Sequence, residues 1–224
     1  GPENQDSDFT WAEFVKRTNG ELVNGWGNLV NRTATMIHKS FGQIPAAGEL
    51  NADDLALLAT VNEGFATIGA LIERHRQKNA LAEAMKIVAE VNKYVTDQAP
   101  FKLKADDERE RLGTILHVIA QAVSDCTTIL SPFLPHSSNE IHAAMGGQGE
   151  IAPMPRLEEV DDLDGGDSYP IITGDYTATL RWESRPITVG APVGKPSPIF
   201  TKLDPSVVEE ELRRLDPEAD GESA

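Results

Sequence analysis

Three polar side chains with nucleic-acid-binding chemistry recur at helical spacing near the N-terminus: Asn24, Asn28 and Arg32. Residues four apart lie above one another on a helix, so the three form a row. An asparagine amide matches the edge of a base, and a guanidinium binds a base or a phosphate with two bonds or stacks on a base plane. The row can equally be a solvated helix face or a hydrogen-bond network between helices, and spacing alone leaves both interpretations open.

Two glycines interrupt the same row, Gly25 and Gly27, and each costs a helix interior about 1 kcal/mol relative to alanine. Because they lack side chains, they are candidate positions for the close approach of another helix or of a nucleotide backbone. Trp26 between them continues the apolar period and is predicted to anchor the core.

A second candidate lies in the stretch 92–104, "NKYVTDQAPFKLK". Pro100 disfavours the helical state of the residue before it, which projects Phe101 away from the end of the helix. Lys102 and Lys104 follow, and an exposed aromatic ring between basic residues is typical of a platform on which an unpaired base stacks. The alternative is that Phe101 caps the core and that the lysines are solvated.

Patterns typical of catalysis or metal binding do not occur in the sequence. The five histidines lack HxxxH or Cys/His ligand spacing, and "MGGQG" follows a predicted helix, so it indicates a helix stop and not a phosphate loop. Cys126 falls in helical periodicity, which predicts a buried, inert thiol in a reducing compartment. We expect a binding module with no catalytic residue, metal or cofactor of its own.

The elements that position these candidates are predicted to be helices. Apolar residues, Phe14 among them, recur at helical spacing in five segments, at about 10–41, 51–75, 79–99, 106–130 and 137–146. Long helices joined by short loops bury their apolar stripes against antiparallel neighbours. The predicted fold is therefore mainly α, an antiparallel helical bundle with an irregular acidic C-terminal extension.

The character of the sequence changes after Gly146. "EEVDDLDGGD" is predicted to be an acidic linker, "TATLRW" and "RPITVG" to be short strands, and the end of the chain to be disordered after a last helix. The predicted organisation has four parts: a junction at 1–10, a helical bundle at 11–147, an acidic linker or insertion at 148–185, and a C-terminal extension at 186–224. The helix of this extension covers about 205–215.

The net charge of −16 taken alone argues against a nucleic-acid-binding protein. However, residues 150–224 hold 17 acids against 7 bases, so most of the excess lies in the last third. A polyanion would have to use a local patch on the first part of the chain. The sequence lacks an apolar run near 18 residues and the basic and apolar regions of a signal peptide, so we expect no membrane partner.

Four motifs, in this order, give the chain a family resemblance: "GNLVNR", "NKYVTDQAP", "SPFLPHSSNEIHAAMG" and "GKPSPIFTKLD". Together they resemble the C-terminal anticodon-binding domain of bacterial methionyl-tRNA synthetase, and the beginning "GPENQDSDFTW" resembles the junction with the catalytic part. The acidic stretch "EEVDDLDGGDSYPIITGDY" is similar to an actinobacterial form.

The resemblance implies a helical bundle that reads the CAU anticodon of tRNA(Met). In this family an asparagine and an arginine four residues apart contact anticodon bases, and these positions are Asn28 and Arg32 here. An aromatic residue after a proline, usually tryptophan, stacks on an anticodon base, and that position is Phe101. The phenylalanine keeps a stacking face but lacks the indole donor. Asn24, Pro100, Lys102 and Lys104 are expected to support the site.

The resemblance also implies what surrounds this chain. The HIGH-like and KMSKS-like signatures are missing from it, so the use of ATP, Mg²⁺ and methionine is expected of a separate catalytic domain of the same polypeptide. The stretch 186–215 resembles the part that returns to that domain. A cytoplasmic monomer is expected. The alternatives are a valine or isoleucine synthetase domain and a helical scaffold that binds protein only.

Overall fold

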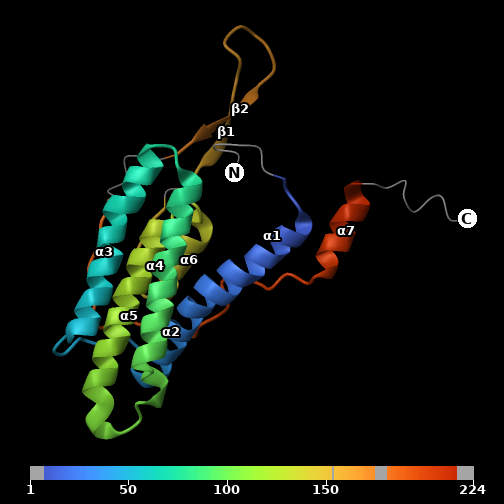
Figure 1. Cartoon of the computed structure of the whole chain (residues 1–224). Coiled ribbons are helices and arrows are strands. Elements are labelled where there is room, and N and C mark those ends of the chain that lie inside the picture. Colours follow the sequence, from blue (N-terminus) through green and yellow to red (C-terminus); the bar gives the residue numbers. More distant parts are fainter. Residues whose placement is uncertain (1–7, 153, 175–180, 216–224) are drawn as a thin grey trace, which may run out of the picture.

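The computed structural model describes residues 8–152, 154–174 and 181–215, and this part of the chain is mainly helical, as predicted (Figure 1). The central helices are α3 (Ala52–Glu73), α4 (Gln77–Gln98) and α5 (Arg109–Leu130), which run antiparallel in succession. The shorter α6 (Pro135–Ala144) packs against α5, and the 3₁₀ turns η2 (Pro100–Lys102) and η3 (Asp106–Glu108) connect α4 to α5.

One long helical rod, formed by three successive elements, crosses this bundle. These are α1 (Trp11–Arg17), the π-helical stretch η1 (Thr18–Gly27) and α2 (Asn28–Ser40). α2 ends toward the same end of the bundle as the α4–α5 connection, at the bottom of Figure 1. The prediction of one α-helix over 10–41 was therefore right in extent and wrong in winding, because η1 opens the turn to i→i+5 hydrogen bonds.

Capping chemistry explains where the helices begin and end. The Thr10 hydroxyl accepts from the Glu13 amide, and Asn51 and Asp54 form a reciprocal capping box at the start of α3. At the end of the bundle where α3 begins, α4 ends at Ala99, whose φ of 44° is left-handed, and Pro100 follows. The chain therefore leaves α4 in an abrupt turn.

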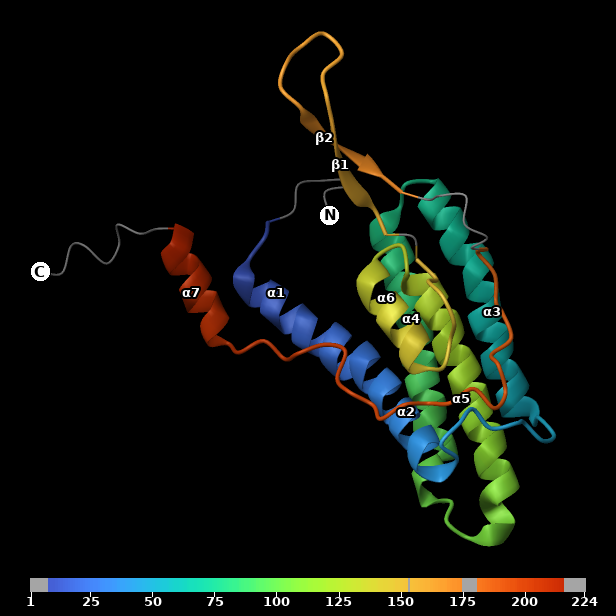
Figure 2. The same cartoon turned by 180° about the vertical axis from the view of Figure 1, so that it is seen from behind.

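The core of the bundle contains Trp26, which is 1% exposed, together with the apolar stripes of α3, α4 and α5. The predicted role of Trp26 as an anchor is confirmed. Phe14 was wrongly predicted to be buried and is 43% exposed. The reason is that α1 extends away from the bundle (Figure 2), and there the Phe14 ring packs against the rings of Phe9 and Trp11.

A C-terminal segment, residues 181–203, wraps around the helices, and we refer to it as the belt (Figure 2). Trp182 of the belt donates its Nε1 hydrogen to the carbonyl of Phe65 on α3, at 2.7 Å. On α5, Gln121 Oε1 accepts from the Ile187 amide at 3.0 Å. These bonds tie two helices to one irregular segment.

The belt continues across the α2–α3 loop to η1. The Ile44 amide donates to the Ala191 carbonyl at 2.9 Å, and Asn19 exchanges two hydrogen bonds with the backbone of Leu203. The last helix, α7 (Ser206–Leu215), then lies against α1. The helix predicted at about 205–215 is confirmed.

The strand predicted at "RPITVG" is not found, and the one predicted at "TATLRW" falls mostly outside the described residues. Residues 177–180 lie outside the described residues, and 185–190 belong to the belt, whose amides bond to distant groups instead of to a neighbouring strand. The strands of the described part are β1 (Arg156–Val160) and β2 (Tyr169–Thr173), an antiparallel hairpin in the segment predicted as a linker. This hairpin projects from the end of the bundle opposite the α4–α5 connection (Figure 1).

Two helices of the described part, Ala52–Glu73 and the helical segment Asp106–Leu130, are long and apolar enough to cross a membrane by length and composition. Core helices of soluble proteins meet the same criterion, and most of the second helix is buried.

Candidate nucleic-acid interface

The asparagine row lies in an open groove at the start of α2. Asn24 and Asn28 are exposed, and with Asn31 they form one wall of a groove of about 330 Å³. Within the described residues, none of these three amides makes a side-chain hydrogen bond. The spare donors and acceptors of the row therefore face space large enough for a ligand.

The opposite wall of this groove is the belt, through Pro198, Ile199 and Phe200. Phe200 approaches the rod at Gly27, where an added Cβ would lie 2.9 Å from Phe200 Cδ2 and 3.0 Å from the Leu22 carbonyl oxygen. In this chain the close approach expected at Gly27 is thus made by the belt. At Gly25 an added Cβ would meet only ordinary contacts, beginning at 3.5 Å.

Arg32 is half-buried one turn farther along α2, with a neutral partner only. Its Nη2 donates to Asn92 Oδ1 at 2.7 Å and to the Asn92 carbonyl at 3.4 Å. Its Nε is buried and has no hydrogen-bond partner. In the described part no carboxylate pairs with Arg32, and burial lowers the pKa of its guanidinium. Arg32 thus takes part in a hydrogen-bond network between helices through its Nη2. In the described part of the chain, its Nε and the amides of Asn24 and Asn28 are unpaired.

Phe101 stands exposed at the end of α4. Pro100 is buried, whereas the Phe101 side chain is 56% exposed, so the alternative in which Phe101 caps the core is wrong. The left-handed Ala99 and the 3₁₀ turn after it aim the ring outward. Lys102 and Lys104 are exposed on either side of the turn's end. The chain thus presents an aromatic face next to two cations.

The row and Phe101 lie toward one end of the bundle, linked by α4. Arg32 bonds to Asn92 in the last half of α4, and from there the helix rises roughly 9 Å to its end. Sequence reasoning missed Asn31, Asn92 and Phe200. Asn31 follows Asn28 by three residues, so helical spacing could have indicated it. Asn92 begins the motif "NKYVTDQAP", which could have indicated it as well. The sequence around Phe200 gave no comparable signal.

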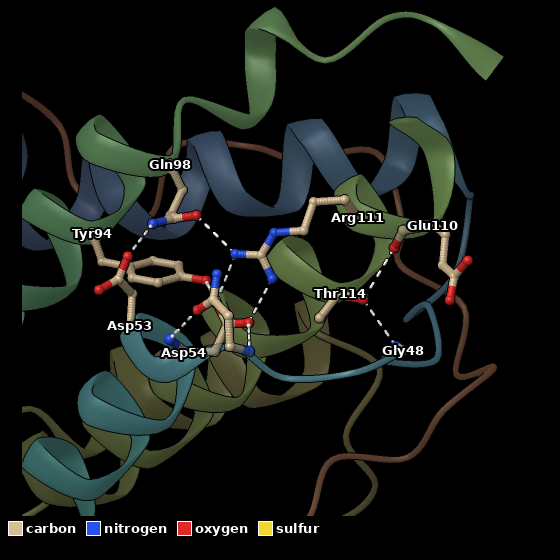
Figure 3. A network of polar contacts seen from close by, with 9 residues as sticks. Gly48, Asp53, Asp54, Tyr94, Gln98, Glu110, Arg111 and Thr114 are labelled. Carbon is tan, nitrogen blue, oxygen red and sulfur yellow. Dashed lines mark hydrogen bonds and ion pairs between the residues drawn. The ribbon is translucent and has the colours of Figure 1, made fainter. Parts of the chain in front are cut away.

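A second polar cluster lies near the same end of the bundle, and its members bond to one another (Figure 3). Asp54 is fully buried, and Arg111 donates to its two oxygens at 2.5 and 2.9 Å. Tyr94 donates its hydroxyl hydrogen to the same carboxylate, and Gln98 accepts from Arg111 at 2.8 Å. These bonds join α3, α4 and α5.

Electrostatics confirm that this cluster is internally compensated. Burial alone raises the pKa of Asp54, but the bonds from Arg111, Tyr94 and the Asn51 amide outweigh it and lower the pKa. The bond to Asp54 raises the pKa of Arg111. Because its charges are paired and its polar groups are bonded, this cluster can stabilise the fold and offers little to a ligand.

The remaining candidates for chemistry are inert. Cys126 is buried, and burial raises the pKa of its thiol. His38 and His117 bond to backbone carbonyls of Val193 and Pro45. Among residues 8–152, 154–174 and 181–215, His, Cys, Asp and Glu form no cluster that could hold a metal ion.

The fold is that of a helical anticodon-binding domain, and sequence comparison agrees. The family model of the anticodon-binding domain of methionyl-tRNA ligase matches residues 44–173, and a model of class I tRNA synthetases (M) matches residues 1–34. The chain belongs to the family of anticodon-binding domains of methionyl-tRNA ligase. Asn24, Asn28 and Arg32 fall in the second match, and the domain limits expected from the sequence stay predictions.

The curated relatives are methionine–tRNA ligases, and the similar solved structures are methionyl-tRNA synthetases. The chain is 68% identical over 216 residues to a methionine–tRNA ligase of Nocardioides sp. and 59% identical over 218 residues to one of Salinispora arenicola, in each case over 96% of this chain and 36% of the relative. It superposes on apo methionyl-tRNA synthetase of Mycobacterium tuberculosis with a TM-score of 0.72, at 23% identity, over 92% of this chain and 37% of that one. The chain spans about a third of the length of its relatives.

Proposed function

We propose that this chain reads the CAU anticodon of tRNA(Met) as part of a methionine–tRNA ligase. The observation that carries the proposal is the arrangement at one end of the bundle. Among the residues that the structure describes, the Asn24 and Asn28 amides are unpaired, Arg32 has no acidic partner, and the Phe101 ring is exposed. Unpaired bases are recognised in proteins by such a combination of hydrogen bonds and stacking.

In this mechanism each residue has a defined task. Asn28 and Arg32 hydrogen-bond to the edges of splayed anticodon bases, and Phe101 stacks on one base plane. Asn24, Pro100, Lys102 and Lys104 support the site, the lysines near the RNA backbone. The correct anticodon then favours docking of the acceptor end in the catalytic domain of the same polypeptide.

The activity of the whole enzyme is part of the proposal. The catalytic domain uses ATP with Mg²⁺ and methionine, and this chain supplies only anticodon recognition. The enzyme is proposed to act as a cytoplasmic monomer without a membrane partner. The names of the relatives support this assignment over a valine or isoleucine enzyme.

A titration of the 224-residue chain tests the proposal. Fluorescence anisotropy measures binding of a labelled RNA hairpin whose loop presents CAU, compared with loops that carry one changed anticodon base, at low and at high salt. We expect a preference for CAU that falls by about one to two orders of magnitude in Asn28→Ala, since a base contact is worth about 1–3 kcal/mol. Asn62→Ala, an exposed position on α3, is the matched control. Equal affinity for all loops would refute anticodon reading and favour a scaffold that binds protein only.

A further inference from the structure

Asn92 lies between the proposed base reader Arg32 and the π-helical stretch η1. Its Oδ1 accepts from Arg32 Nη2 at 2.7 Å. Its Nδ2 donates to the Val88 carbonyl at 3.1 Å and to the Gly25 carbonyl at 3.4 Å. One amide therefore uses its acceptor for the guanidinium and both donors for the backbones of α4 and η1, which fixes the orientation of the acceptor.

The guanidinium held in this way keeps its charge. Arg32 has no carboxylate partner in the described part of the chain, and its Nε is buried without a hydrogen bond. A buried donor without a partner loses its hydrogen bonds to water without replacement, so it is an unfavourable arrangement for a purely structural arginine. A neutral amide orients the fork, whereas a carboxylate would both orient it and cancel its charge.

From these contacts we infer that Asn92 is the positioning residue of the anticodon site: it orients Arg32 toward RNA while leaving its charge uncompensated. The inference rests on the proposed function, because it gives Arg32 the task of binding RNA. Asn92 acts through Arg32 and needs no contact with the RNA. It also couples the site to η1, since the Gly25 carbonyl that it binds belongs to the π-helical stretch.

Two substitutions at this position separate positioning from simple structural support. Asn92→Ala removes the acceptor, and we expect affinity for the CAU hairpin to fall about tenfold, as for the loss of a hydrogen bond to a charged group. Asn92→Asp keeps the size of the side chain and the acceptor for Arg32, but it pairs Arg32 with a carboxylate and removes the two hydrogen bonds that Nδ2 donates to Val88 and Gly25. Because the carboxylate compensates the charge of Arg32, we expect this variant to bind the hairpin about tenfold or more weakly than the parent chain.

A double-mutant cycle with Arg32→Ala provides the decisive readout. If Asn92 acts through Arg32, the variant carrying both alanines binds as weakly as Arg32→Ala alone. Thr96→Val is the control, because the Thr96 hydroxyl donates to the Asn92 carbonyl on the exposed side and should change affinity less than twofold.

Additive losses in the cycle, or an Asn92→Asp variant that binds CAU as tightly as the parent chain, would overturn the inference while leaving the proposed function intact. Unchanged affinity in Arg32→Ala would instead refute the role of Arg32 in the proposed function, and the inference with it. Thermal unfolding followed by circular dichroism confirms that each variant is folded before its affinity is compared.

Discussion

Arg111 and Arg32 lie on helices of the same bundle, but their guanidinium groups have different partners. Arg111 forms a two-bond pair with a fully buried carboxylate and a third bond to Gln98. Within residues 8–152, 154–174 and 181–215, Arg32 bonds to the neutral Asn92 alone, and its Nε has no partner. One cation is compensated inside the protein, and the other is not.

This difference separates polar groups that hold the fold from polar groups that await a ligand. A paired, hydrogen-bonded cluster contributes to the arrangement of α3, α4 and α5 and gives nothing to RNA. An unpaired cation beside spare amides costs stability and is retained where function needs it. Damage at Arg111 should therefore change stability alone, whereas damage at Arg32 and Phe101 should change RNA binding alone.

The largest effect is expected from Arg111→Leu. This change leaves the Asp54 carboxylate buried without its cation, and breaking a buried pair in this way costs about 3–5 kcal/mol. Urea unfolding at neutral pH measures the loss. Arg109→Leu is the matched control, because Arg109 is exposed and lies over the Phe41 ring with one bond to the Ser40 carbonyl. A loss equal to that of the control would contradict a stabilising role for the cluster.

The second-largest effect is expected on RNA binding, at the exposed ring of Phe101. Phe101→Ala removes the exposed ring, and loss of one base-stacking contact should weaken CAU-hairpin binding by about 1–3 kcal/mol without changing the unfolding curve. Phe101→Trp restores a stacking face and should bind at least as tightly as the parent chain. Anisotropy titrations of the three proteins check this order, and an alanine variant that binds like the parent would exclude Phe101 from the site.

Gly27→Ala tests how the belt closes the groove. The added Cβ would lie too close to both Phe200 and the Leu22 carbonyl, so overpacking should cost about 1–3 kcal/mol and displace the belt from η1. Gly25→Ala is the control, since only ordinary contacts surround that position. Urea unfolding compares the two, and equal losses would show that the close approach at Gly27 is unimportant.

The smallest effect is a difference in acid sensitivity. The native pKa of Asp54 lies below its ordinary value, so its contribution to stability is present above about pH 4 and is lost as pH falls through the native pKa. Asp54→Asn removes this titration. The stability gap between parent and variant should therefore shrink as the pH falls from about 5 to about 2. Unfolding by urea at the two pH values measures it, and a gap that stays constant would contradict the lowered pKa.

Local rules predicted the helices well, because their caps and apolar periods lie within each segment. Asn51 and Thr10 begin helices as capping rules require, and Trp26 is buried as its period indicates. The π-helical winding of η1 escaped prediction, since π-helices are rare and the apolar residues were compared with the α-helical period alone. Phe14 escaped as well, because periodicity gives the face of a helix and not whether another element covers it.

The sequence predicts those features of the site that depend on neighbouring residues in one segment. Spacing places Asn28 and Arg32 on one helix face, and Pro100 predicts the exposure of Phe101. The partners that give these residues their physical properties are distant in sequence: Asn92 lies 60 residues from Arg32, and Phe200 reaches Gly27 from the belt. The hairpin in the acidic segment was missed for the same reason, since its stability depends on register between two strands.

The most direct test of the account compares the two arginines in one experiment. CAU-hairpin affinity and urea stability are measured for the parent chain, Arg32→Ala and Arg111→Ala at a temperature where all three are folded. We predict that Arg32→Ala binds the hairpin about tenfold to a hundredfold more weakly with stability within about 1 kcal/mol of the parent, and that Arg111→Ala shows the opposite pattern. Parent-like RNA binding by Arg32→Ala would contradict the central claim that this uncompensated cation is kept for the anticodon.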